Sequence, residues 1–80
     1  MTLRDEHRRR TRDALVEAGL GLFLQNGFDA TTIDEIALSA GVSRATAFRY
    51  FASKEDLFYT RQYARIAELR AELLAAIPAD

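Results

Sequence analysis

The fold of this chain is decided by residues 31–57, TTIDEIALSAGVSRATAFRYFASKEDL. The segment holds three hydroxyl residues that can start helices, Thr32, Ser43 and Ser53, because each can accept a hydrogen bond from an amide in the first turn that follows. Gly41 separates the first two helical segments and suits a tight turn between them. The segment therefore predicts two short helices joined by a turn and followed by the start of a longer helix.

The first short helix begins after Thr32 and ends at Gly41. Thr32 and Glu35 have the spacing of a capping box, in which the hydroxyl accepts from the Glu35 amide and the carboxylate reaches back to the Thr32 amide. The apolar residues recur at i, i+3, i+4 and i+7, which predicts one buried face. These residues are Ile33, Ile36, Ala37 and Ala40.

The second short helix, about Arg44 to Phe51, has a packing face and an outward face. With Ala47 at the centre of the buried face, a rotation of about 100° per residue points Ala45 and Arg49 away from the core. The outward face bears small, aromatic and basic side chains and no carboxylate: Arg44, Ala45, Thr46, Phe48 and Arg49. This face is unlike an ordinary acidic solvent face.

A longer helix precedes this pair and spans about Asp5 to Asn26. Its apolar residues follow the helical period only in the second half, so the early turns should project beyond the core. Gly19 and Gly21 each weaken the helix by roughly 1 kcal/mol relative to alanine. We therefore expect a neighbouring helix to approach closely at both glycines.

A long fourth helix over residues 53–77 opens at the Ser53 cap and must stop before Pro78. Its roughly 24 residues extend about 36 Å, more than three shorter helices can cover. An apolar stripe on its distal half is expected to pack against a partner: Tyr59, Tyr63, Ile66, Leu73 and Ile77. The predicted fold is all-α: one domain over residues 1–80, a three-helix bundle whose second and third helices form a helix-turn-helix, plus this fourth helix.

Composition excludes several classes of protein. The 80 residues include no cysteine and a single histidine, His7, so disulfides and a zinc site are not expected. No apolar run is long enough to cross a bilayer and no signal peptide is visible, which favours a cytoplasmic setting. The sequence contains no nucleophile–base pair and no pair of carboxylates at a spacing typical of an active site. We therefore expect no enzyme, no catalytic residue, no metal and no cofactor.

The net charge of −1 conceals an uneven distribution of charge. Five of the eleven basic residues lie in the first twelve positions: Arg4, Arg8, Arg9, Arg10 and Arg12. Other basic residues, among them Arg44, Arg49 and Lys54, lie in or near the second short helix. Several acidic residues lie at helix starts. Because salt screens fields beyond about 10 Å, the local charge matters for a nucleic-acid partner more than the total does.

The outward face of the second short helix has the shape and chemistry of an element that enters the major groove of double-stranded DNA. Arginine offers donors that match guanine, and small side chains let the backbone approach base edges. The predicted base-reading residues are Arg44, Ala45, Thr46 and Arg49. The predicted phosphate or sugar contacts are Thr32, Ser43, Phe48, Tyr50 and Lys54. Thr32 and Ser43 also have a complete structural role as helix caps.

The arginines at positions 4 to 12 have two readings. They can form a basic N-terminal arm over residues 1–10 that follows phosphates or enters a minor groove. They can also belong to a solvated helix start, where Asp5 and Arg9 are spaced to pair within one helix.

The chain resembles the DNA-binding domain of the TetR family of bacterial transcriptional repressors over about residues 9–58. The resemblance rests on several motifs: Asn26-Gly27-Phe28, Thr31 to Ala37, Ala40-Gly41-Val42-Ser43, and Thr46 to Phe51 followed by Ser53 to Leu57. Two positions depart from the family pattern. Phe48 replaces a usual tyrosine whose hydroxyl touches a phosphate, and Ala47 replaces a larger aliphatic residue.

The resemblance implies sequence-specific duplex-DNA binding in the bacterial nucleoid, with repression through a palindromic operator. It also implies a homodimer in the full-length family member. The helix over residues 53–77 would lead towards a regulatory domain, and we expect neither that domain nor a site for a small-molecule inducer within these 80 residues. The alternative is a helical protein-interaction module that uses the distal part of this fourth helix, and the two differ in how strongly salt weakens binding.

Overall fold

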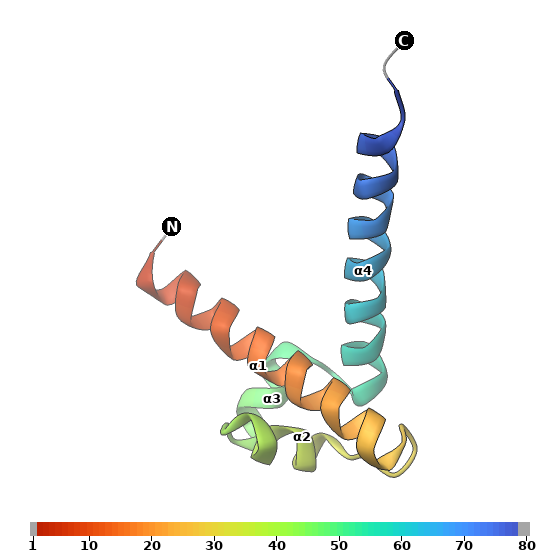
Figure 1. Ribbon diagram of the computed structural model, residues 1–80. Helices are drawn as coiled ribbons and strands as arrows, with labels where there is room; N and C mark the ends of the chain where they lie inside the picture. The colour runs from red at the N-terminus through yellow and green to blue at the C-terminus, as the bar shows by residue number, and fades with distance from the viewer. Residues whose placement is uncertain (1, 79–80) are drawn as a thin grey trace.

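The computed structural model describes residues 2–78, and the outermost ends of the predicted 1–80 domain lie outside this range. It contains the helices α1 (Leu3–Asn26), α2 (Ile33–Ala40), α3 (Arg44–Tyr50) and α4 (Lys54–Ala76), and no strand within residues 2–78. In Figure 1, α1 crosses above α2 and α3, whereas α4 rises away from all three. The all-α prediction of a helix-turn-helix with a long fourth helix is confirmed.

The first helix begins two residues earlier than the predicted Asp5 start. Thr2 caps α1 because its hydroxyl accepts from the Asp5 amide at 3.2 Å, while the Asp5 carboxylate accepts from the Thr2 amide at 3.3 Å. This reciprocal cap satisfies two amides that the helix itself leaves without partners. The chain from Leu3 onward is therefore a helix, as in the second of the two readings, and the contact of its arginines with phosphate stays a prediction.

The cap of α2 differs in one detail from the predicted capping box. The Thr32 hydroxyl accepts from the Glu35 amide at 3.2 Å, as predicted. The Glu35 carboxylate, however, accepts from the Thr32 hydroxyl at 3.1 Å and not from the Thr32 amide. The helix ends at Gly41, whose φ of 77° lies in the left-handed region that suits glycine.

The core lies where α1, α2, α3 and the start of α4 meet. Its fully buried side chains include Leu15, Ile36, Ala47 and Leu57. A Cβ placed on Gly19 would lie 2.9 Å from a Leu57 methyl carbon, so this glycine does permit a close approach of α4. The same expectation is wrong for Gly21, which has no atom within 4 Å of such a Cβ.

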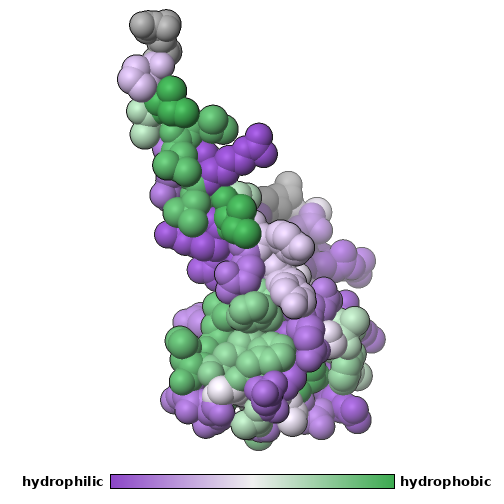
Figure 2. Space-filling view, turned by 90° about the vertical axis from the view of Figure 1, so that its right-hand side faces the viewer, coloured by the Kyte–Doolittle hydropathy of each residue, from purple (hydrophilic) through white to green (hydrophobic). Residues whose placement is uncertain are grey.

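The distal half of α4 stands away from the bundle. Figure 2 shows hydrophobic side chains along one side of the projecting column that this helix forms. The predicted stripe is exposed, and two further leucines lie with it: Tyr59, Tyr63, Ile66, Leu69, Leu73, Leu74 and Ile77. Within residues 2–78, no helix is both long and apolar enough to cross a membrane.

Candidate nucleic-acid interface

The outward face of α3 has the arrangement that its helical period predicts. Ala47 is fully buried, whereas Ala45 and Arg49 are exposed and Thr46 is half-buried. The seven residues of α3 include no acidic side chain, and Arg49 lies in the last turn. The face is open to a large partner and carries positive charge.

A groove between α1 and α3 brings two distant parts of the sequence together. Arg4 and Arg8 of α1 line it opposite Thr46, Arg49 and Tyr50 of α3. The groove has a volume of about 540 Å³, and none of its lining residues is acidic. Three of the predicted DNA contacts thus lie directly beside two of the N-terminal arginines.

Two further lining residues, His7 and Thr11, were not predicted as site residues. Both lie on the same side of α1 as Arg4 and Arg8, because positions three and four apart share one helix face. The sequence pattern of α1 contains this face, but it does not say that the face turns towards α3.

The remaining N-terminal arginines do not line this groove. The Arg12 guanidinium carbon lies 5.8 Å from the centre of the Phe51 ring, and Arg12 lines a different groove, between α1 and α4. Arg9 and Arg10 are exposed on α1 and do not line the groove beside α3. The helix therefore divides the arginine cluster among several directions.

Arg44 is held by two neighbours on the protein itself. Its Nε lies 2.9 Å from a carboxylate oxygen of Asp34, the second residue of α2. Its guanidinium carbon also lies 5.4 Å from the centre of the Phe48 ring. Phe48 is 42% exposed, so the aromatic ring and the guanidinium together form part of the outer surface of α3.

Ser43 and Thr32 act as helix caps in the structure. The Ser43 hydroxyl accepts from the Thr46 amide at 3.1 Å and lies 3.0 Å from the Thr46 hydroxyl. Both cap residues are exposed, so their capping role leaves room for a phosphate at the same helix starts. Their contact with phosphate stays a prediction.

Lys54 has a structural role that the sequence pattern did not indicate. Its ammonium donates to the carbonyl oxygens of Phe28 at 2.7 Å and Asp29 at 3.2 Å, and it lies 4.5 Å from the centre of the Phe28 ring. The ammonium thus ties the start of α4 to the turn after α1. Two of its three N–H donors are thus engaged within the protein, and the contact of Lys54 with phosphate stays a prediction.

Replacement of Lys54 by methionine tests this structural role. The variant Lys54→Met keeps most of the stem but loses two charge-assisted hydrogen bonds, so the free energy of unfolding should fall by about 1–2 kcal/mol. Thermal unfolding followed by circular dichroism should show the loss. Loss of the predicted phosphate contact should also weaken binding of the folded variant to all duplexes alike. An unchanged melting temperature would contradict the structural role, and an unchanged DNA affinity would remove Lys54 from the proposed interface.

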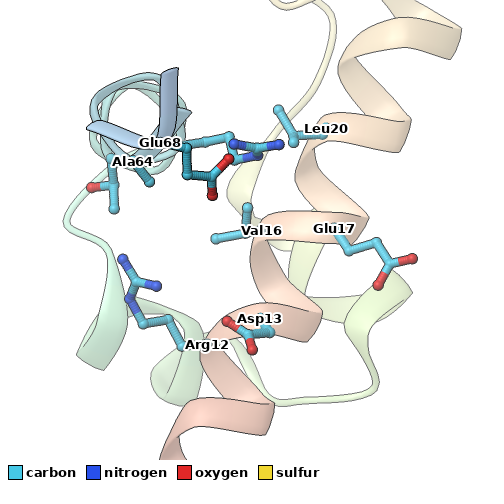
Figure 3. Close-up of a pocket in the computed structure, with 9 residues that line it drawn as sticks. Arg12, Asp13, Val16, Glu17, Leu20, Ala64 and Glu68 are labelled. Atoms are coloured by element: carbon cyan, nitrogen blue, oxygen red, sulfur yellow. The ribbon is translucent and has the colours of Figure 1, made fainter. Parts of the chain in front are cut away.

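The groove between α1 and α4 has a different chemistry. Figure 3 shows Val16 and Leu20 of α1 facing Ala64 and Glu68 of α4. Three carboxylates are among the residues that line it, those of Asp13, Glu17 and Glu68. Arg12 and Arg61 also line it, so positive and negative side chains are mixed in this groove. Residues 2–78 contain no group of three or more side chains that could hold a metal ion.

The fold and this surface together define a helix-turn-helix domain: a capped α2, a left-handed glycine turn, and an α3 with one face buried and one basic face open. Residues 15–59 match the family described as bacterial regulatory proteins, tetR family. The chain therefore belongs to the TetR family, and its fold is the N-terminal helix-turn-helix fold of that family's transcriptional regulators.

Individual relatives agree with this assignment. The chain is 47% identical over 58 residues to the HTH-type transcriptional regulator TcmR of Streptomyces glaucescens, covering 72% of this chain and 26% of TcmR. It is 37% identical over 73 residues to the HTH-type transcriptional regulator AcrR of Shigella flexneri, covering 88% of this chain and 34% of AcrR. The chain thus corresponds to about a quarter to a third of these relatives.

A solved structure supports the fold independently. The fatty acid degradation regulator FadR from Bacillus halodurans superposes with a TM-score of 0.65 at 25% sequence identity. The match covers 84% of this chain and 38% of FadR.

Proposed function

We propose that this chain binds duplex DNA in a sequence-specific manner, with α3 in the major groove and α2 lying across the phosphate backbone. The observation that supports this proposal best is the surface where α3 meets α1. There the exposed Arg49 lies in a groove with Arg4 and Arg8, and no acidic residue lines it. A helix has the width to lie in the major groove. The positive charges on this face would replace counterions on the phosphates of the two strands.

The proposed contacts divide into two kinds. Arg49, with Thr46 and Ala45 beside it, reads base edges, since arginine matches guanine and small side chains allow a close approach. Arg44 is the fourth base-reading residue. The proposed phosphate and sugar contacts come from both sides of the groove, from the caps and from the start of α4: Arg4, Arg8, Thr32, Ser43, Phe48, Tyr50 and Lys54.

In the whole protein, this binding would regulate transcription, and occupancy of an operator would repress it by excluding other proteins. One short recognition helix reads only a few base pairs, so tight binding calls for two copies on a palindromic site. The proposed setting is the bacterial cytoplasm, with no catalytic role. Membership of a family of transcriptional regulators favours this function over a protein-interaction module built on distal α4.

Selection from a random pool of duplexes tests the proposal. The purified chain should enrich one short sequence motif, and the enriched sites should show two-fold symmetry if two copies bind together. Affinity for the enriched duplex should fall steeply with salt. Neutralisation of three phosphates by arginine gives a slope of about −2.7 in log K against log salt.

Two outcomes would contradict the proposal. A selection that enriches no motif would remove sequence specificity. Binding that barely changes between low and moderate salt would point to an apolar contact through α4 instead. Light scattering after size exclusion, with and without the enriched duplex, shows whether the chain pairs only on DNA.

A further inference from the structure

We infer that Asp34 is a specificity-determining residue: it positions Arg44 for base recognition and also disfavours binding to unselected DNA. The inference rests on the proposed function, because it requires α3 to face the major groove. It concerns an acidic side chain that neither the motif pattern nor the charge pattern marks as part of the interface. The observation behind it is the contact between Asp34 and Arg44.

The geometry places Arg44 between two supports that come from different helices. The Asp34 carboxylate of α2 lies 2.9 Å from Arg44 Nε, and the Phe48 ring of α3 lies 5.4 Å from the guanidinium carbon. The nitrogen that the contact joins to the carboxylate is Nε. The two terminal nitrogens form the end of the fork that can reach guanine O6 and N7 together.

A long arginine side chain normally loses considerable rotamer freedom when it binds. Contacts that already restrict Arg44 in the free protein reduce that loss and restrict the directions in which it can reach a base. The ion pair is 71% and 63% exposed at its two side chains, so in water it contributes little to folding. Against DNA, where water is excluded, the same contact becomes stronger.

The carboxylate has an opposite effect on phosphates. Asp34 lies in the first turn of α2, which is proposed to cross the backbone, and a negative charge there repels unselected DNA. One side chain would thus weaken the sequence-independent part of binding while it sharpens one base preference. Specificity is a difference between affinities, so both effects act in the same direction.

The competing explanation is that Asp34 only stabilises α2, since acidic residues are favourable in the first turn of a helix. The two explanations differ in what the variant Asp34→Asn changes. A purely structural residue would alter the melting temperature and lower affinity for all duplexes alike. A positioning residue would lower the preference at one base position and raise affinity for unselected duplexes.

The experiment compares Asp34→Asn, Arg44→Ala and the double variant on the duplex that the unmodified chain enriches, and on all three single-base changes at each position. Glu35→Gln is the matched control. It removes one negative charge from the same turn of α2, where the carboxylate contacts Thr32 and not Arg44. Thermal unfolding of each variant reports any loss of structure separately.

The expected result is that Arg44→Ala removes the preference at one position of the site, and that Asp34→Asn weakens the preference at that same position by about two- to fivefold. Asp34→Asn should also bind a random duplex about twofold more tightly. In the Arg44→Ala background, Asp34→Asn should no longer alter any base preference. Glu35→Gln should change affinity for all duplexes together and leave the preferences intact.

Two results would overturn the inference and leave the proposed function in place. One is that Arg44→Ala removes a preference that Asp34→Asn leaves unchanged. The other is that Arg44→Ala removes no preference although the chain still selects one motif. Failure of the unmodified chain to select any motif would instead overturn the proposed function, and this inference with it.

Discussion

The charge reversal Arg49→Glu is expected to weaken binding to the enriched duplex by at least about 100-fold, roughly 3 kcal/mol. The variant loses a pair of donors directed at a base and puts a carboxylate into the groove beside Arg4 and Arg8. The milder change Arg49→Ala should relax the preference at one or two base positions. Fluorescence anisotropy with labelled duplexes measures both effects.

Arg70→Glu serves as the control for charge. It makes the same change in net charge on the exposed distal half of α4, away from the proposed interface. It should leave affinity within about twofold at moderate salt, because screening limits the reach of a surface charge. Equal losses from Arg49→Glu and Arg70→Glu would mean that α3 has no special role in binding.

Leu57→Ala should destabilise the domain by about 2–5 kcal/mol. Leu57 is completely buried, and its methyl groups lie against Gly19 at the crossing of α1 and α4. A chain of this length has a total stability of roughly 4–12 kcal/mol, so the loss is a large share of the total and should lower the melting temperature by at least about 8 °C. Thermal unfolding followed by circular dichroism at several temperatures measures the loss.

Leu73→Ala provides the same chemical change at an exposed position of α4, where the leucine is 67% exposed. It should change the free energy of unfolding by less than about 0.5 kcal/mol. If both variants melted at the same temperature, the contact between α4 and α1 would contribute nothing to the fold.

The correct predictions concern features that depend on neighbours in sequence. The hydroxyl caps at Thr32 and Ser43 accept from amides three residues away. The buried Ala47 and the exposed Arg49 follow from the rotation of one helix about its own axis. Both kinds of feature are set by hydrogen bonds and spacings within a single turn or helix, so a linear pattern contains them.

Two misses are local: the Thr2 cap, which moves the start of α1, and the Glu35 carboxylate, which accepts from the Thr32 hydroxyl and not from its amide. The other errors and omissions concern contacts between elements. Lys54 binds a carbonyl 26 residues earlier in the chain, and Asp34 meets Arg44 across the turn between α2 and α3. Thr31 is 1% exposed, and its buried hydroxyl is satisfied because it donates to the carbonyls of Gly27 and Leu22. Its position before the Thr32 cap does not indicate this role.

The order of helices, their caps and the composition of the α3 surface were determined by the sequence alone, since each depends on interactions within a few residues. The tertiary structure decided which of those surfaces meet. In it, Arg4 and Arg8 line one groove with Arg49, and Arg12 lines another groove between α1 and α4. The Lys54 ammonium donates to a carbonyl oxygen in the turn after α1. Such pairings depend on the angles at which helices cross, and those angles follow from packing the whole core, including the close contact at Gly19.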